Sequence, residues 1–201
     1  MDMNSVQRGI LAVVAVMTLC LAVGCGTVRE TLPSRSATEQ LLISTAADRA
    51  VTSMPEDSLD GKKVYIDTTR LDSLDKPYVE QTVRDFVLNK NASVVPKDNA
   101  DMVLEVSSGA LSVDRRDYLL GIPSFPLPIP FGGEVVKFPE IPIFKALFYQ
   151  GKAKMRFTSL DPASQTQVYD IPLCYGQSKD SYWWFLLLGP FRFTDLPPDG
   201  R

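Results

Sequence analysis

The sequence predicts an α+β fold: a mixed β-sheet with two helices packed on one face, a proline-rich extended segment and a C-terminal β-hairpin. Three features indicate this fold. Two segments repeat apolar residues at helical spacing, several others alternate apolar and polar residues, and residues 121–142 are dense in proline. We expect residues 36–196 to form a single domain, with residues 197–201 as a loose tail.

The first helix is predicted to begin at a capping box over residues 36–39, in which a serine and a glutamate cap each other's backbone. Small and apolar residues then recur at helical spacing, at Leu42, Ala46, Ala50 and Met54. Pro55 ends the run, and the small residues suit close packing on a sheet. A strand is expected over residues 63–68, where Val64 and Ile66 alternate with polar neighbours.

The second helix is predicted to start with Asp75 as its cap and Pro77 in its first turn. Its apolar stripe consists of Val79, Val83, Phe86 and Val87, which we expect to face a sheet carrying Val64, Ile66 and Val103. Asn89 or Asn91 ends the helix. Two strands follow, over residues 92–95 and 100–113, and Gly109 marks a bulge in the second.

Residues 121–142 contain six prolines, interleaved with large apolar residues. Prolines at this density exclude a helix and a central strand, so we predict a polyproline-like conformation with a hinge at Gly132 and Gly133. Because the segment is apolar between its prolines, it should lie against a surface. That surface is either the core of its own domain or an external partner.

The strand pattern returns after this segment, and residues 144–157 and 166–175 are predicted to form a hairpin around a turn at 161–164. A basic row lines one face of the first strand: Lys152, Lys154 and Arg156. We interpret this row as the solvated face of the hairpin rather than as a binding patch. The run at 182–191 is apolar throughout, which leaves two alternatives open: a fully buried strand or an exposed patch.

The N-terminal stretch at 9–25 is apolar, follows Arg8 and ends in small residues, as secretory signal peptides do. Its end, residues 21–25, resembles the lipobox of bacterial lipoproteins. The resemblance implies cleavage before Cys25, attachment of diacylglycerol to the Cys25 sulfur and acylation, such as palmitoylation, of the new N-terminus. Residues 1–24 would then be the signal peptide and residues 25–35 a lipidated tether. Because Gly26 is not an aspartate, the resemblance favours the periplasmic face of the outer membrane, with the inner membrane as the alternative.

The first half of the mature chain resembles a group of periplasmic α/β domains. The resembling segments are residues 63–67, 78–88, 92–95 and 100–106. They look like the N-terminal domain of the Tol translocation protein, the curli-secretion lipoprotein and the lipoprotein activators of peptidoglycan synthases. Residues 38–42 are similar to the start of a family of uncharacterised bacterial lipoproteins, which offers no function to transfer.

The composition argues against catalysis. The chain has no His, so it lacks the commonest general base and a common metal ligand. Cys174 lies in a strand pattern with no base to activate it, and we interpret it as an inert buried thiol. The sequence shows no phosphate loop, dinucleotide fingerprint or metal-ligand cluster, and its net charge of −3 does not suggest nucleic-acid binding. We expect no enzyme activity, no cofactor, no metal and no nucleic-acid partner.

The sequence therefore predicts a membrane-anchored binding or assembly module of the cell envelope. Its partners would be the lipid bilayer, through Cys25, and an envelope protein. The alternative is a periplasmic carrier of a lipid or another apolar ligand. The predicted contact surface for the partner or the membrane consists of Phe125, Leu127, Ile129, Phe131, Trp183 and Trp184.

Overall fold

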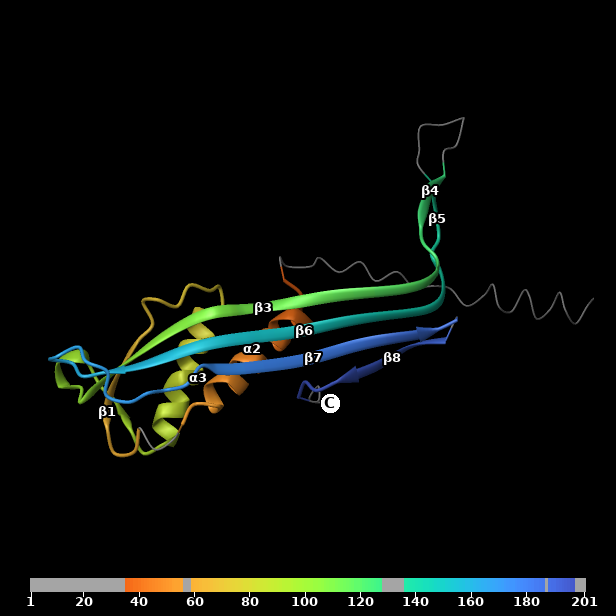
Figure 1. The fold of residues 1–201 in the computed structure, drawn as a ribbon. Helices are drawn as coiled ribbons and strands as arrows, with labels where there is room; N and C mark the ends of the chain where they lie inside the picture. The colour runs from red at the N-terminus through yellow and green to blue at the C-terminus, as the bar shows by residue number, and fades with distance from the viewer. Residues whose placement is uncertain (1–34, 56–58, 128–135, 187, 198–201) are drawn as a thin grey trace, which may run out of the picture. The chain divides into compact units, whose positions relative to one another are not determined.

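The computed structural model describes residues 35–55, 59–127, 136–186 and 188–197. The elements follow one another along a unit that begins at Arg35 (Figure 1). They are α2 (Ala37–Thr52), β1 (Lys63–Asp67), α3 (Lys76–Asn89), β2 (Ser93–Val94), the 3-10 helix η1 (Lys97–Asn99), β3 (Met102–Ile122), β4 (Phe125–Leu127), β5 (Val136–Phe138), β6 (Ile141–Leu160), β7 (Cys174–Phe185) and β8 (Leu188–Thr194). The predicted signal peptide, the predicted lipidation site Cys25 and the predicted tether up to residue 34 lie outside the described residues.

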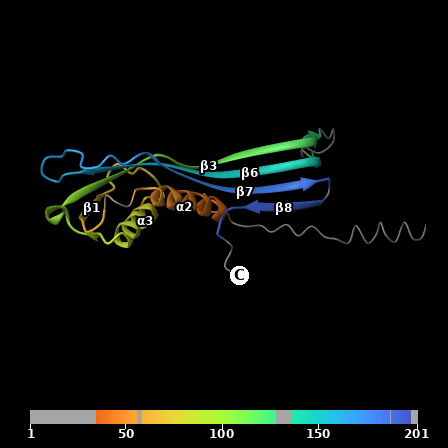
Figure 2. The same cartoon turned by 60° about the horizontal axis from the view of Figure 1, so that its bottom comes forward.

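Six strands form one sheet in the order β2-β1-β3-β6-β7-β8, and β4 and β5 pair in a separate two-stranded sheet. Strand β1 runs parallel to β2 and β3, whereas β3, β6, β7 and β8 are mutually antiparallel neighbours. Figure 2 shows α2 and α3 along the same face of this mixed sheet. The predicted α+β class, with a mixed sheet and two helices, is confirmed. Within the described ranges, no helix has both the length and the apolar content needed to span a membrane.

Helix α2 begins at the predicted capping box. The Glu39 backbone N–H donates to the Ser36 hydroxyl at 3.2 Å, and the Ser36 N–H donates to the Glu39 carboxylate at 3.0 Å. Asp75 also occupies the predicted cap position of α3, but its carboxylate accepts two hydrogen bonds from Arg35, at 2.8 and 3.2 Å, and none from the helix. Asn91 follows α3 with a left-handed φ of 56°, as expected for a helix end.

Helix α2 packs almost directly on the backbone of β6 and β7. A Cβ atom built on Gly176 would lie 1.8 Å from the Ala46 carbonyl oxygen, and one built on Gly151 would lie 2.4 Å from the Leu42 carbonyl oxygen. The Ser178 hydroxyl donates to that same Leu42 carbonyl at 2.6 Å. The small residues predicted on the helix therefore meet glycines on the sheet, which lets the two backbones approach.

The buried stripe of α3 is confirmed at all four predicted positions: Val79, Val83, Phe86 and Val87. Val64 faces it from β1, and Ile66 packs at the edge of the same core. The prediction for Val103 is wrong. Val103 is the cross-strand partner of Tyr65 and lies on the other face, so its neighbours Met102 and Leu104 contribute to the core instead.

Strand β3 is longer than predicted, because it continues past Val113 to Ile122 beside an equally long β6. The predicted bulge at Gly109 is confirmed by a register shift between Ser108 and Ala110. A bulge inserts one residue, so it inverts which side chains face the helices. Before it, Leu104 and Val106 face the helices; after it, Leu111 and every second residue beyond do.

The predicted hairpin partner at 166–175 is wrong. Residues 161–173 form a connection between β6 and β7. In the predicted turn at its start, the Asp161 carboxylate accepts hydrogen bonds from the backbone N–H groups of Ala163 and Ser164. The return strand is β7, which starts at Cys174 and continues through both tryptophans. Gly176, the glycine that lets α2 approach the sheet, lies in β7. The preceding run at 166–173 alternates as a strand does but contains no glycine. Packing of α2 therefore favours β7 as the strand that pairs with β6.

The described part of the proline-rich segment is β-structure rather than polyproline. It includes the end of β3 and the start of β6, which pair with each other, and between them in the chain the short strands β4 and β5. Pro142 is tolerated in β6 because it lies beyond the last residue that pairs with β7, Phe144. The predicted hinge, together with Ile129 and Phe131, lies outside the described residues. Figure 1 shows β4 and β5 turning away from the direction of β3 and β6.

Candidate functional site

Strands β3, β6, β7 and β8 continue beyond the part of the sheet that α2 and α3 cover (Figures 1 and 2). We call this part the sheet extension: residues 114–122 of β3, 141–150 of β6, 179–185 of β7, and β8. Since a sheet has two faces and neither described helix packs on this part, the side chains there have no helical layer to bury them.

Aromatic side chains from four strands gather on one face of the extension, the face opposite to the helices. Tyr118, Ala146, Trp183 and Phe191 are successive cross-strand partners, and such partners share a face. We call the whole set the aromatic face; its members are Tyr118, Phe144, Phe148, Trp183, Phe185, Phe191 and Phe193.

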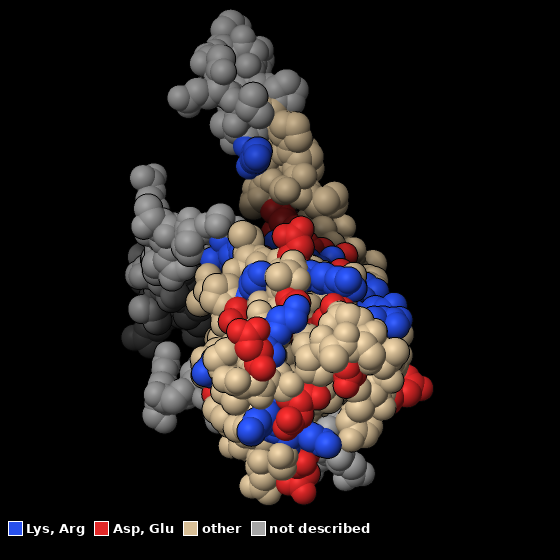
Figure 3. Space-filling view, turned by 90° about the vertical axis from the view of Figure 1, so that its left-hand side faces the viewer, with Lys and Arg blue, Asp and Glu red and all other residues tan. Residues whose placement is uncertain are grey.

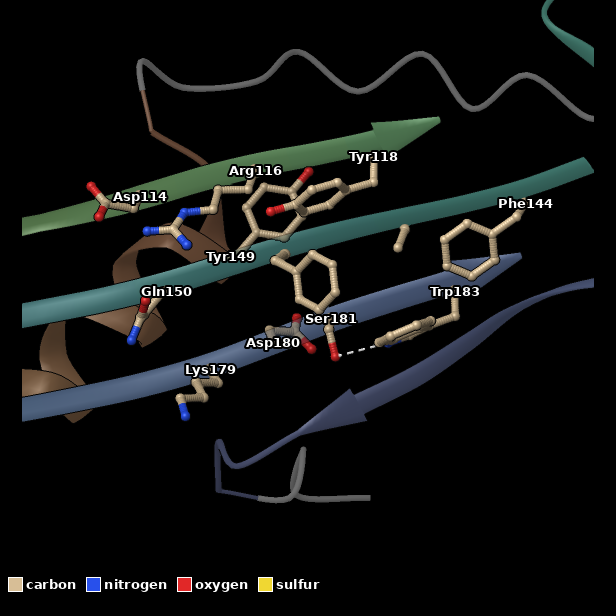
Figure 4. Close-up of a pocket in the computed structure, with 12 residues that line it drawn as sticks. Asp114, Arg116, Tyr118, Phe144, Tyr149, Gln150, Lys179, Asp180, Ser181 and Trp183 are labelled. Carbon is tan, nitrogen blue, oxygen red and sulfur yellow. Dashed lines mark hydrogen bonds between the residues drawn. The ribbon is translucent and has the colours of Figure 1, made fainter. Parts of the chain in front are cut away.

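The rings of the aromatic face touch in an unbroken network. Figure 4 shows part of it, including Tyr118, Phe144 and Trp183. Trp183 is central, with its ring centroid 5.2 Å from that of Phe148 and 5.7 Å from that of Phe144. Tyr118 contacts Phe148 edge-on at 5.6 Å. The Trp183 indole N–H donates to the Ser181 hydroxyl at 3.3 Å. Each aromatic pair contributes roughly 0.5–1.5 kcal/mol beyond area burial, so the surface is preorganised.

Although it is preorganised, the aromatic face stays open. The exposed fraction is 64% for Phe193, 52% for Tyr118, 50% for Phe185 and 48% for Phe191. Isolated exposed apolar residues are ordinary in proteins, but a contiguous exposed cluster marks an interaction surface. The small side chain of Ala146 forms the floor of an open trough of about 620 Å³ between these rings.

Charged residues border the trough on the side nearer the helices. Arg116 and Lys179 line that end on the same face as Tyr118 (Figure 4). The Lys152 ammonium hydrogen-bonds to Asp114 and holds the pKa of that carboxyl below its ordinary value. Lys154 lies over the Tyr175 ring, 5.8 Å from its centroid. These contacts fit the interpretation of the basic row as a solvated face.

The opposite face of the extension holds a buried carboxylate. Asp180 is fully buried and accepts from Arg192 at 2.9 and 3.2 Å and from the Tyr182 hydroxyl at 2.9 Å. Burial, with the neighbouring Asp180 carboxylate, raises the pKa of Tyr182. Trp184 stacks on Tyr182 with a centroid distance of 6.3 Å, and Lys145 lies over the Trp184 ring. The ion pair between Asp180 and Arg192 therefore links β7 to β8 through buried polar contacts.

The structure separates the predicted contact residues into three places. Trp183 is at the centre of the aromatic face, whereas Trp184 points to the opposite face because consecutive strand residues alternate. Phe125 and Leu127 lie on β4, in the small second sheet, with exposed fractions of 42% and 39%. Phe125 stacks on Phe138 of β5 at 4.9 Å.

Sequence reasoning missed most of the aromatic face, notably Tyr118, Phe144, Phe148 and Phe193. The charged run at 114–117 concealed the continuation of β3. A strand signal could still have been found here: Asp114, Arg116 and Tyr118 recur at every second position, as the residues on one face of a strand do.

The described residues offer no alternative site with clear chemistry. Cys174 is buried, and burial raises the pKa of its thiol, as expected for an inert cysteine. Over the same ranges, no group of three or more His, Cys, Asp or Glu side chains could hold a metal ion.

A family described as a family of unknown function (DUF6655) matches residues 19–198. The chain belongs to this family. The matched range takes in Cys25 as well as every described helix and strand, so the aromatic face lies within the region that defines the family. The comparison with curated proteins finds no match.

Proposed function

We propose that this protein is a lipid-anchored, non-catalytic binding module of the bacterial cell envelope, and that the aromatic face is its contact surface. The observation that carries the proposal is the open network of seven aromatic side chains, four of which are about half exposed or more. The lipobox-like residues 21–25 support the anchoring. The module faces the periplasm, held in the outer membrane or, as the alternative, in the inner membrane.

The proline-rich segment extends the same surface in this proposal. Its side chains Phe125 and Leu127 are exposed, and the short β4–β5 sheet holds them in fixed positions. Prolines reduce the entropy lost when such a segment becomes ordered against a partner. Phe125, Leu127 and Trp183 would then belong to one contact region, together with the predicted residues Ile129 and Phe131.

The first test concerns the anchor. We expect Cys25→Ser to abolish lipidation and to release or mislocalise the protein, because a thioether-linked diacylglycerol needs the cysteine sulfur. Several acyl chains contribute roughly 0.8 kcal/mol per buried methylene, whereas an unlipidated chain has no such contribution. Mass spectrometry of the mature N-terminus checks this. An unmodified N-terminus at Met1 or Met3 on the membrane-bound protein would contradict it.

The second test concerns the contact surface. A photo-reactive benzoylphenylalanine replacing Phe193 should give abundant cross-linked products in living cells, since Phe193 is 64% exposed at the edge of the aromatic face. The matched control replaces Tyr175, which is 56% exposed on the same sheet face but lies over the helix-covered part. We expect a yield several-fold lower there, because the partner should contact the aromatic rings and not the basic row. Equal yields at both positions would argue against the aromatic face as the site.

The trough favours a carrier as the second candidate function. Its volume of about 620 Å³ lies within the range of small-molecule sites, and it places Phe148 and Trp183 beside the charged Arg116. Such a trough suits an amphiphile with an anionic head. Native mass spectrometry of the purified protein separates the two candidates, because a stoichiometric bound lipid supports the carrier.

A further inference from the structure

We propose that the end of the sheet extension inserts into the interfacial layer of the bilayer that holds the lipid anchor. The level of insertion is set by the row through Tyr118, Ala146 and Trp183. This inference rests on the proposed function and specifies its contact: the aromatic face binds lipid rather than a second protein. The strongest observation is a change of polarity along the strand axis, which both β3 and β7 show.

Beyond the row, toward the strand ends, the side chains are almost all apolar. Strand β3 ends with Leu119, Leu120 and Ile122, and β6 begins with Ile141 and Ile143. The charged exceptions near the start of β6 are Glu140 and Lys145, which pair with each other at 2.7 Å. Twelve of the twenty large apolar side chains that are exposed among the described residues lie on the extension or on β4. Exposure of apolar area is therefore concentrated at one end of the sheet.

On the other side of the row the first charged residue follows after one position on β3 and after three positions on β7. Residues 114–117 of β3 are all charged, and Lys179 and Asp180 precede the aromatic run of β7. Figure 3 views the end of the domain near β1 and shows Lys and Arg interspersed with Asp and Glu. The end of the domain near β1 is suited to water, whereas the part of the extension beyond the row is suited to an apolar medium.

Both faces of the extension are apolar at its end, and this favours lipid over protein. Tyr118 and Leu120 lie on the aromatic face, whereas Leu119 lies on the opposite face. The exposed fractions are 63% for Leu120 and 38% for Leu119. A second copy or a protein partner docking on the aromatic face would leave the opposite face in water. A bilayer surrounds an inserted end on both sides.

The row itself has the residues that membrane interfaces select. Tyr118 and Trp183 lie at one level across the sheet, and Trp184 is the next residue along β7. Tryptophan and tyrosine favour the headgroup region because each has an apolar body and a polar tip. Arg116 and Lys179 follow on the charged side, where they would meet lipid phosphates. The stretch from Tyr118 to Ile122 spans about 13 Å at roughly 3.3 Å per residue, a depth within one leaflet.

The anchor can reach the same bilayer. Arg35, the first described residue, lines a small pocket with Leu111 and Val113 of β3. The distance along β3 from Val113 to Tyr118 is about 17 Å, at roughly 3.3 Å per residue. The segment between Cys25 and Arg35 can extend to about 33 Å. The tether therefore permits insertion without holding the domain away from the membrane.

The two tryptophans provide the test, because Trp183 and Trp184 are the only two in the sequence. The mature lipidated protein is reconstituted in vesicles of equal parts phosphatidylcholine and phosphatidylglycerol. In a second sample, the phosphatidylcholine carries bromine atoms on its acyl chains. We expect the emission intensity in brominated vesicles to fall to about half or less of that in plain vesicles, since interfacial tryptophans lie beside the acyl chains.

A paired substitution shows whether quenching requires insertion. Leu120→Asp combined with Leu188→Asp should remove most of the quenching, because it charges two exposed positions at the sheet end, 63% and 68% exposed. The control Leu74→Asp, at an 84% exposed position before α3, should quench as the wild type does. Circular dichroism verifies that all three proteins are folded.

Two results would overturn the inference: equal emission in plain and brominated vesicles, or full quenching of the paired variant. If quenching is absent while light scattering in detergent shows a dimer, the aromatic face contacts a second copy. If quenching is absent while position 193 cross-links to another protein, the proposed function stands and only the lipid contact fails. An absence of adducts at position 193 would instead remove the proposed function itself.

Discussion

Gly176→Ala should prevent folding or destabilise the domain by an amount at or above the upper end of the roughly 1–3 kcal/mol that overpacking usually costs. The added Cβ would lie 1.8 Å from the Ala46 carbonyl oxygen and 2.6 Å from the Ala50 nitrogen. Both are backbone atoms of α2, so no side chain can rotate out of the way. Relief requires the helix to move off the sheet, which would open the core around Met155 and Cys174.

The control for this substitution is Gly109→Ala in β3. A Cβ at Gly109 would lie 3.4 Å from the flexible Lys154 side chain and 3.8 Å from the Lys154 carbonyl oxygen, which is ordinary van der Waals contact, so we expect a change below about 1 kcal/mol. Urea unfolding followed by circular dichroism measures both variants. Similar stabilities for the two would mean that α2 does not pack as closely on β7 as the structure indicates.

Phe86→Ala should destabilise the domain by about 3–5 kcal/mol, because it removes a large side chain from a closed core and leaves a cavity. Phe86 is only 8% exposed, and it belongs to the core cluster that joins α3 to the sheet. The Lys90 ammonium lies 5.4 Å from its ring centroid, so a cation–π contact is lost as well.

Leu88→Ala is the matched control for Phe86, since Leu88 lies on the same helix but is 49% exposed. We expect a change within about 0.5 kcal/mol for it. Thermal and urea unfolding should rank the two variants clearly apart. If Phe86→Ala lost no more stability than the control, the α3 stripe would not form the core.

These two predictions differ in what the sequence by itself provides. The stripe containing Phe86 was predictable from the sequence, because helical spacing is local and the capping box at Ser36 and the proline at Pro77 mark helix starts without reference to the rest of the fold. The bulge at Gly109 was predictable for the same reason, since a glycine within a strand pattern has few other uses.

The significance of Gly176 could not be predicted, because a glycine requires close backbone approach only when a particular helix lies against it. The same dependence explains the wrong return strand at 166–175. Local alternation allows several segments to pair with β6, and the choice of β7 depends on contacts with α2 that are distant in sequence.

For the candidate site, the sequence by itself determined that the C-terminal run and the proline-rich segment are unusually apolar, and it identified Trp183. Only the tertiary structure decided which face each residue takes. The Gly109 bulge shifts strand parity in β3 by one residue, which places Tyr118 on the same face as Ala146 and Trp183. Trp184 takes the opposite face because consecutive strand residues alternate. Side chains in a sheet alternate with period two, so the membership of a surface built from four strands depends on register, and register is fixed by contacts between strands far apart in the chain.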